Sequence, residues 1–295
     1  MSAKVGIVIV NYNGASYQND AMKSLYESDF KDFKVVVVDS ASSDNSIELL
    51  EKEYPEVVVL RQMENVGVAR GNNIGIEYCK SIGTEYTLLM NNDIEMDSKM
   101  LGVLVEKANT DVITVPKIFY YEPHDMIWYG GGYFNWKRGN APHIGMNEYD
   151  KGQCDEERFV EYSPTTCMLI HNSVFDRLGK IDERYFMYWD DTDWCVRVAD
   201  AGLKILYVPT AIMWHKVSSS TGGMASKVKL YYMNRNKLYF LKKHSKHIST
   251  LTWIRTYLRM YYLICVGFVK KNNNRIISKA IAHYRKGIDF RCDDI

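Results

Sequence analysis

The sequence predicts an α/β protein built on a Rossmann-like, mostly parallel sheet with helices on both faces. Three short apolar runs, at residues 5–10, 35–38 and 57–60, alternate with segments of helical periodicity. Connections of that length suit right-handed crossovers between parallel strands. A fourth run, Tyr86–Met90, is solidly apolar and stops abruptly at residues 91–93, as expected for a strand buried on both faces.

Composition excludes several classes of protein. The 295 residues carry 37 Lys and Arg against 36 Asp and Glu, so the charge balance indicates no nucleic-acid partner. Six cysteines occur without a CxxC pair, which argues against a zinc cluster or a disulfide framework and predicts a cytoplasmic location. We see neither a signal peptide nor an uncharged apolar window of about 18–20 residues that would span a membrane.

Polar side chains follow three of the predicted strands, at the edge where open α/β sheets bind ligands. They are, in chain order, Asn11, Tyr12, Asn13, Asp39, Ser40, Asn91, Asn92 and Asp93. A carboxylate beside two amides can bind a hard divalent cation, a sugar or a nucleotide. The alternative is an Asn/Asp turn before the next helix, and Asp39 can likewise cap a helix or accept hydrogen bonds from a base or ribose.

A glycine-rich stretch, residues 65–75, precedes the fourth strand, and no dinucleotide glycine fingerprint follows the first strand. Glycines let a backbone approach a ligand closely, and the start of a helix favours anions. Its candidate donor-binding residues are Asn65, Gly67, Arg70 and Asn73. Arg70 either contacts a diphosphate or is solvated at the start of a glycine-rich helix.

A second polar cluster, formed by Asp190, Asp191 and Asp193, lies where an aromatic run gives way to an amphipathic helix. Helix capping and the macrodipole explain one or two of these carboxylates. Three beside aromatic side chains indicate a carboxylate whose pKa is raised toward that of a general base. Further along, His215 ends a short apolar run, and the polar loop 218–223 after it is a lid candidate or simply disordered.

Taken together, these motifs resemble family 2 glycosyltransferases of the GT-A fold, in the rhamnosyltransferase-like branch. The matching stretches, in chain order, are residues 9–14, 38–44, 65–75, 89–93, 179–183, 188–193, 214–215 and 231–236. Each is a loose motif by itself. Their common order along the chain makes a chance match very improbable.

The resemblance implies transfer of a sugar from a nucleoside-diphosphate sugar to an acceptor hydroxyl, with inversion and with Mg²⁺ or Mn²⁺ on the diphosphate. It implies metal ligands at Asp93 and His215 and a general base at Asp191. It also implies donor contacts at the strand-end and glycine-rich residues given above, and we place the acceptor near Trp189, Asp190 and Thr166.

Three departures from the family pattern affect these expectations. Asn91 replaces the first carboxylate of the family's DXD motif, so the metal has fewer charged ligands and its identity stays open. Thr166 stands where many relatives have glycine, which predicts a differently shaped acceptor pocket. Asp190 replaces the usual Glu, a conservative change.

We expect a GT-A catalytic domain at 1–225, with a nucleotide-binding half at 1–115 and an acceptor-binding half at 116–225. A C-terminal helical region follows at 226–295. Within it, residues 248–270 are rich in aromatics, flanked by lysines and interrupted by Arg255 and Arg259. That pattern predicts an interfacial helix on the inner face of the cell membrane. The alternative is packing on the domain or on a second protomer.

The expected donor is dTDP-rhamnose or a UDP-hexose, and the expected acceptor is a glycan or a lipid-linked glycan of surface polysaccharide assembly. A sugar-nucleotide nucleotidyltransferase is a second interpretation, but residues 11–14 lack the basic group that its first loop needs. A third is a nucleotide-sugar or glycan-binding protein that has lost catalysis, against which the intact Asp191 argues.

Overall fold

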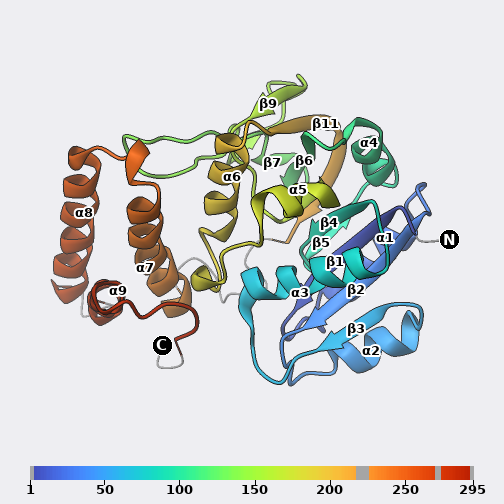
Figure 1. Cartoon of the computed structure of the whole chain (residues 1–295), viewed down its shortest axis with the longest axis horizontal. Coiled ribbons are helices and arrows are strands. Elements are labelled where there is room, and N and C mark those ends of the chain that lie inside the picture. The colour runs from blue at the N-terminus through green and yellow to red at the C-terminus, as the bar shows by residue number, and fades with distance from the viewer. Residues whose placement is uncertain (1–2, 217–225, 270–273, 293–295) are drawn as a thin grey trace.

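One sheet organises the computed structural model, which describes residues 3–216, 226–269 and 274–292 (Figure 1). The main strand order is β3-β2-β1-β4-β10-β6-β11-β5. The strands of this path are β1 Val5–Asn11, β2 Phe33–Asp39, β3 Val58–Arg61, β4 Tyr86–Met90, β5 Ile94–Met96, β6 Val112–Tyr120, β10 Cys167–His171 and β11 Lys204–His215. Short strands β7 Met126–Tyr129, β8 Glu148–Tyr149 and β9 Arg158–Val160 extend it. The lid candidate at 218–223 lies outside the described residues.

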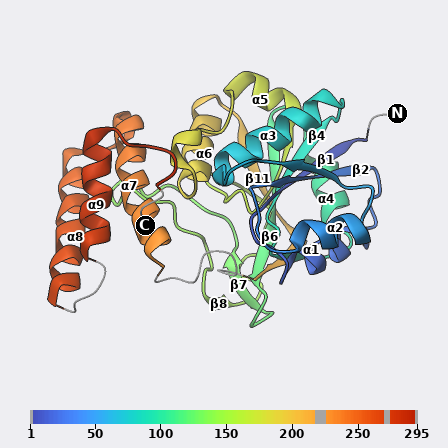
Figure 2. The ribbon, with the colours of Figure 1, turned by 90° about the horizontal axis from the view of Figure 1, so that it is seen from below.

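The first half of the sheet is the predicted parallel unit. Strand β1 lies between β2 and β4 and pairs with both in parallel. Helices cover both faces: α3 (Gly67–Ser81) and α5 (Asn172–Leu178) lie on one side, and α1 (Gln18–Tyr26), α2 (Ser46–Glu53) and α4 (Met100–Lys107) on the other (Figure 2). A Cβ added at Gly75 would come within 2.2 Å of Val8, so this glycine lets α3 pack tightly on β1.

In the second half of the sheet, antiparallel strands bring distant segments of the chain to the same edge. Strand β10 pairs antiparallel with β4, and β6 pairs antiparallel with β10. Strand β11 then runs parallel to β6, and the short β5 returns antiparallel to β11. Residue Ile94 therefore pairs with His215, 121 positions further along the chain. The sheet is thus mostly parallel along its main path and antiparallel where β10 and β5 enter it.

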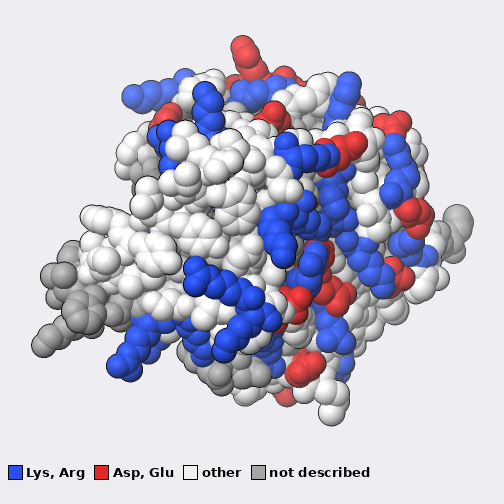
Figure 3. Space-filling view, turned by 60° about the vertical axis from the view of Figure 1, so that its left-hand side comes forward, with Lys and Arg blue, Asp and Glu red and all other residues white. Residues whose placement is uncertain are grey.

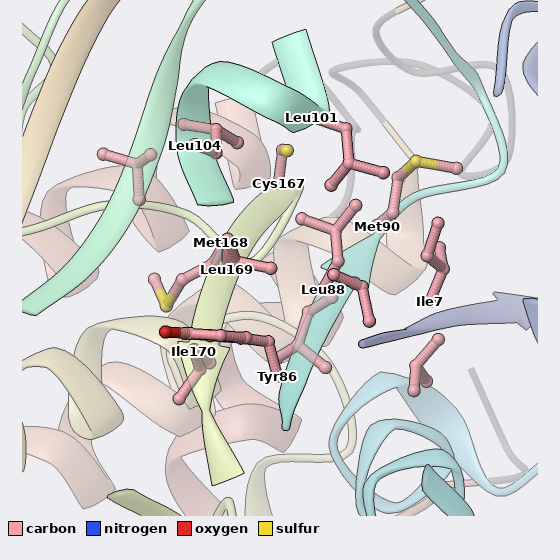
Figure 4. Packing of buried hydrophobic residues seen from close by; sticks show 14 of the residues in the cluster. Ile7, Tyr86, Leu88, Met90, Leu101, Leu104, Cys167, Met168, Leu169 and Ile170 are labelled. Atoms are coloured by element: carbon pink, nitrogen blue, oxygen red, sulfur yellow. The ribbon is translucent and has the colours of Figure 1, made fainter. Parts of the chain in front are cut away.

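The hydrophobic core lies around the middle strands. Every residue of β4 is buried, as expected for a strand with neighbours on both sides and helices above and below. Leu101 and Leu104 of α4 pack over β4 and β10 (Figure 4), and both side chains are fully buried. Because this core supports the ends of β1, β2 and β4, the polar residues that follow these strands sit on a rigid base.

Three local expectations are corrected. The sequence predicts that Pro116 ends a strand, yet β6 continues through it, because β11 has a register shift opposite this position, between Val208 and Ile212. The two apolar runs at 204–208 and 211–214 consequently form one strand. The sequence also predicts that Ser42 or Ser43 caps the helix after β2, but α2 starts after Asn45, and the Ser42 hydroxyl bonds Asp39 of the candidate site instead.

The C-terminal helices pack beside the sheet domain (Figure 1). They are α7 Lys227–Lys243, α8 Thr250–Val269 and α9 Asn274–Lys286. Ser226 caps α7, accepting a hydrogen bond from the Lys229 backbone. Among the described residues no helix is long and apolar enough to cross a bilayer.

A buried carboxylate, Asp193, joins α7 to α6 (Asp190–Asp200). It is fully buried and bonds Lys243 at the end of α7, His244 directly after that helix and Arg197 of its own helix, at 2.8, 2.8 and 3.2 Å. Burial by itself would raise the pKa of Asp193, but His244 and Lys243 hold it below its usual value. The charged form of Asp193 is therefore an integral part of the contact between the two helices.

We predict that Asp193→Asn lowers the free energy of unfolding by about 3 kcal/mol, because it removes the buried carboxylate that Arg197, Lys243 and His244 share. Asp176→Asn, in an exposed ion pair with Lys80, is the control and should cost less than about 1 kcal/mol. Since the pKa of Asp193 is depressed in the fold, its contribution is lost as the pH falls through that pKa, and the difference between variant and wild type shrinks in acid. Urea titrations at neutral and acidic pH measure both effects, and equal costs for the two variants would contradict this account.

Candidate active site

A hydrogen-bonded network joins the ends of β1, β2 and β4. The Asn11 side-chain amide donates to Asp39 at 3.3 Å and to Ser46 at 3.0 Å, and its oxygen accepts from Asn92 at 2.9 Å. Ser42 donates to Asp39 at 2.5 Å. All five side chains are buried or half-buried. The predicted strand-end residues therefore lie together, with Asp39 held in one orientation.

The neighbours of this network differ in exposure. Tyr12 is exposed, whereas Ser40 is buried, and its hydroxyl has no partner among the described residues. Asn13 has a positive φ of 55°, and its side chain accepts from the Ser43 backbone at 2.8 Å. A Cβ at Gly14 would lie 2.3 Å from the Asn11 oxygen, so only glycine leaves room for the network.

The glycine-rich stretch forms the start of α3, and several of its polar groups form hydrogen bonds within the protein. Gly67 has φ of +71°, and a Cβ there would meet Phe186 at 2.4 Å. Its N–H donates to the Asn65 side chain at 2.9 Å. Asn73 is buried, and its amide donates to Ile181 and Glu183, both at 2.9 Å. These groups attach α3 to the segment that precedes Asp190.

Arg70 occupies a more open position. Its side chain is 43% exposed and lies 3.8 Å from Glu64 and 3.9 Å from Glu183. Both separations are loose, and surface pairs of this kind contribute little to stability. Arg70 is thus the one cation of the stretch that keeps donors available for an anionic ligand.

Asp93 and His215 meet at the opposite side of this edge. The pairing of β5 with β11 brings His215 Nε2 to 3.1 Å from Asp93 Oδ1, and both side chains are buried. That distance suits a hydrogen bond and also two adjacent ligands of an octahedral cation with bonds of about 2.1 Å, which lie about 3.0 Å apart. His215 Nε2 is the ring nitrogen that faces Asp93, so it is the one that could share an ion with this carboxylate, whereas Nδ1 is buried without a partner within the described residues.

Asp93 and His215 fit a divalent cation that takes most of its ligands from groups outside the protein. No group of three or more His, Cys, Asp or Glu side chains suited to a metal occurs among the described residues. Asn91 donates its backbone N–H to Thr166 at 3.0 Å, so β4 and β10 stay joined at the point where the motif lacks its first carboxylate. Two protein ligands leave coordination positions for diphosphate oxygens and water, an arrangement typical of Mg²⁺ sites.

A series of ring contacts leads from this pair to the second carboxylate cluster. The Trp128 ring lies edge-on to His215 and to His143, with centroids 4.7 Å apart in both cases. His143 stacks on Tyr162 at 5.7 Å, and the Tyr162 hydroxyl donates to Asp191 Oδ2 at 2.9 Å. Burial lowers the pKa of His143 to about 4, so its ring is neutral near pH 7. Trp128, His143 and Tyr162 thus form a continuous series of rings, which we call the aromatic wall. Asp93 and His215 lie at one end of it and Asp191 at the other.

Asp190 and Asp191 have different surroundings. Burial raises the pKa of Asp190 to about 8, and the neighbouring Asp191 charge adds to the effect. Asp190 Oδ2 has no partner in the described part of the chain. Burial also raises the pKa of Asp191, but hydrogen bonds from Tyr162 and Thr192 favour its charged form. Of the two, Asp190 is therefore the one that holds a proton more readily, and Asp191 the one whose charged form is better stabilised.

The loop that delivers these carboxylates is strained and held by α7. Phe186, Tyr188 and Trp189 have positive φ angles of 63°, 61° and 72°, which residues other than glycine rarely adopt. The fully buried Asn236 amide donates to the carbonyls of residues 185, 187 and 188 at 2.7, 2.8 and 3.0 Å. Arg235 is also fully buried and donates to carbonyls of residues 184 and 185. Thus α7 fixes where Trp189, Asp190 and Asp191 stand.

Sequence reasoning missed several residues of this site. They are Ser46, Trp128, His143 and Tyr162, and it had Gly14, Ser42, Arg235 and Asn236 only as parts of motifs. Ser42 was interpreted as a possible helix cap, and His143 and Tyr162 lie in an irregular segment. No local pattern reports their partners, which come from distant parts of the chain.

A fold with this sheet order and this polar edge is that of the GT-A glycosyltransferases. The chain belongs to glycosyl transferase family 2, whose profile matches residues 6–179. It is accordingly a glycosyltransferase, as the resemblance implied.

Curated relatives of the chain include rhamnosyltransferases. The dTDP-rhamnosyl transferase RfbF of Shigella flexneri is 25% identical over 304 residues, covering 98% of this chain and 96% of that protein. An N-acetylglucosaminyl-diphospho-decaprenol L-rhamnosyltransferase of Mycobacterium tuberculosis is 42% identical over 66 residues, which span only 22% of either chain. The chain is therefore a rhamnosyltransferase-like member of the family.

Solved structures share the fold. GalNAc-T7, crystallised with UDP, GalNAc and Mn²⁺, superposes with a TM-score of 0.63 at 16% identity, over 82% of this chain and 48% of that one. The mannosyltransferase PcManGT of Pyrobaculum calidifontis, in complex with GDP-Man and Mn²⁺, gives 0.58 at 13% identity, over 97% and 76%. At such identities these likenesses establish the architecture alone.

We predict that Asn236→Ala reduces turnover about 100-fold, because small displacements of catalytic groups have effects of that size. Asn234→Ala is the matched control, since among the described residues this side chain bonds Leu230 of its own helix and no other. Initial rates per folded molecule, with folding checked by circular dichroism, give the comparison. If Asn236→Ala stays folded and turns over at the wild-type rate, α7 does not position the 185–191 segment.

Proposed function

We propose that the chain is an inverting glycosyltransferase that moves a sugar from a nucleoside diphosphate to an acceptor hydroxyl, with Asp191 as the general base. The observation that carries this proposal is the aromatic wall, which has Asp93 and His215 at one end and Asp191 at the other. A donor diphosphate at the first end and an acceptor at the second would share one surface. The 1–115 half would bind the donor and the 116–225 half the acceptor.

The donor nucleoside would contact the network at the ends of β1 and β2. Asp39 has both carboxylate oxygens engaged by Ser42 or Asn11, which fixes its orientation toward a base or ribose. Tyr12 is 46% exposed beside it and offers a ring for stacking. Arg70 is the cation available to the diphosphate, whereas Gly67 and Asn73 would act by shaping the loop around it.

Mg²⁺ or Mn²⁺ would be held by Asp93 and His215. When bound, the ion stabilises the negative charge that develops on the departing diphosphate. Asn91 and Asn92 would support this site from β4 rather than add charge to it. The missing first carboxylate leaves the diphosphate oxygens to supply most of the ion's remaining ligands.

The transfer itself needs a base on the acceptor side. Asp191 Oδ accepts the proton of the acceptor hydroxyl while that oxygen bonds to the anomeric carbon from the face opposite the diphosphate. The bond from carbon to diphosphate breaks, and the diphosphate leaves with the electron pair, so the configuration inverts. Trp189, Asp190 and Thr166 would line the acceptor side, with the protonated Asp190 able to donate a hydrogen bond.

We propose, more specifically, that the donor is dTDP-rhamnose. It is supported by the near full-length match to a dTDP-rhamnosyl transferase. The acceptor would be a growing glycan, or a lipid-linked glycan in assembly of a surface polysaccharide.

We predict that Asp191→Asn lowers turnover by about 10²–10⁴-fold, the range that a general base contributes, while the Kd of the nucleoside diphosphate stays unchanged. Asp200→Asn, at the far end of the same helix, is the control and should keep wild-type turnover. Release of nucleoside diphosphate measures turnover, and calorimetry measures binding. A rate near wild type for Asp191→Asn would show that another group takes the proton.

We predict that Tyr162→Phe moves the acidic limb of kcat to higher pH. The hydroxyl stabilises the charged form of Asp191 and so lowers its pKa; without it the pKa rises, and the base is deprotonated only at higher pH. Tyr133→Phe, an exposed tyrosine of the same irregular region, should leave the profile in place. An acidic limb that stays or moves to lower pH would contradict the assignment of Asp191.

A further inference from the structure

The C-terminal helices carry a charge imbalance that the net charge of the chain conceals. Residues 226–288 contain fifteen Lys and Arg and no Asp or Glu. The rest of the chain has the other 22 of the 37 basic residues and all 36 acidic ones. Such asymmetry between parts of a chain is typical of a segment that meets an anionic surface.

Helix α8 exposes an apolar row on its outer side. Thr252, Thr256 and Met260 face inward and are buried. The outer side chains, which are 49–66% exposed, are Leu251, Ile254, Leu258, Tyr261 and Tyr262. At 3.6 residues per turn they cover an arc of about 100° along about 17 Å of helix. Large apolar side chains grouped in this way mark an interaction surface.

Cations border this row. Arg255 and Arg259 follow Ile254 and Leu258 directly, are exposed, and form no ion pair with another described residue. Arg275, Arg285 and Lys286 are exposed on the adjacent α9. Figure 3 brings this side of the molecule forward and shows an uncharged expanse with Lys and Arg gathered along its border. Long basic side chains suit such a border, because their stems cover apolar surface while their charges reach outward.

We propose that this face, which we call the α8 face (Leu251, Ile254, Leu258, Tyr261 and Tyr262 with Arg255 and Arg259), docks on an anionic lipid membrane. The apolar row enters the interfacial region, and the surrounding cations bind lipid headgroups. A second copy of the chain fits poorly, since pairing two α8 faces would oppose two acid-free cationic surfaces. Nucleic acid would match the charge but leaves the apolar row without a partner.

The inward side of α8, opposite the α8 face, is connected to the candidate base through described contacts. Thr252 Oγ1 donates to the Trp136 carbonyl at 3.1 Å, and the Trp136 ring lies 4.9 Å from Phe134. Phe134 lies 6.3 Å from Tyr162, which bonds Asp191. Docking would thus orient the acceptor side of the site relative to the lipid surface. This orienting role rests on the proposed function, whereas lipid binding does not.

Flotation of the full chain with lipid vesicles, without substrates, tests the proposal. Vesicles of phosphatidylcholine are compared with vesicles that contain about 30% phosphatidylglycerol, since each basic residue near an anionic surface adds measurably to binding. The variants are Leu258→Ser/Tyr262→Ser for the apolar row and Arg255→Glu/Arg259→Glu for the cations. Met63→Ser and Lys52→Glu, exposed residues of the nucleotide-binding half, are the matched controls.

We expect wild type and controls to bind the anionic vesicles at least tenfold better than the neutral ones, and both double variants to lose at least tenfold. Light scattering of the same samples reports the oligomeric state. The proposal is overturned if wild type does not float, or binds both vesicles equally. It is also overturned if wild type is a dimer that Leu258→Ser/Tyr262→Ser converts to a monomer without any change in flotation. Because no turnover is measured, failure here leaves the proposed reaction untouched.

Discussion

The three-residue ladder between β5 and β11 is the interaction on which the candidate site depends. It joins the segment after β4 to a strand more than a hundred residues later, and it places His215 against Asp93. The backbone N–H of Lys216 also donates to the Asp93 carbonyl at 2.8 Å, which extends the pairing by one residue. Without this ladder, the residues after β4 offer a ligand one carboxylate and two amides. The ladder adds the His215 imidazole at the same edge of the sheet.

The second constraint comes from the C-terminal helices. Asn236 and Arg235 of α7 hold the strained loop before α6 by its carbonyls, while Asp193 of α6 is held by Lys243 at the end of α7 and His244 directly after it. The two sets of contacts hold both sides of the segment that contains Asp190 and Asp191. The C-terminal region is consequently part of the site's framework, although none of its residues is proposed to take part in the transfer.

Much of the fold could be predicted because its signals are local. Solid apolar runs such as Tyr86–Met90 and the amphipathic segments between them specify strands and crossover helices. The antiparallel entry of β10 and β5 could not be read in this way, because a strand of three residues has no periodicity. Pro116 was misleading for a similar reason, since the register shift that accommodates it lies on another strand.

The site was predicted unevenly for the same physical reason. The strand-end position pointed to Asp93, and the resemblance pointed to the roles of His215 and Asp191, but the side chains between them are joined by contacts among distant segments. Asn73 shows a structural use that its sequence context does not reveal, because its amide bonds Ile181 and Glu183. The contacts of neutral side chains depend on neighbours that are distant in the chain, so the sequence pattern predicts them poorly.

The most direct measurement of the central claim is anomalous diffraction from crystals soaked with Mn²⁺ and a nucleoside diphosphate. The account predicts one strong manganese peak in contact with Asp93 and His215 Nε2, with diphosphate oxygens completing its coordination and the base near Asp39. Asp93→Asn crystals treated alike should lose the peak. A nucleotide bound at this edge with manganese elsewhere, or with no manganese, would contradict the account.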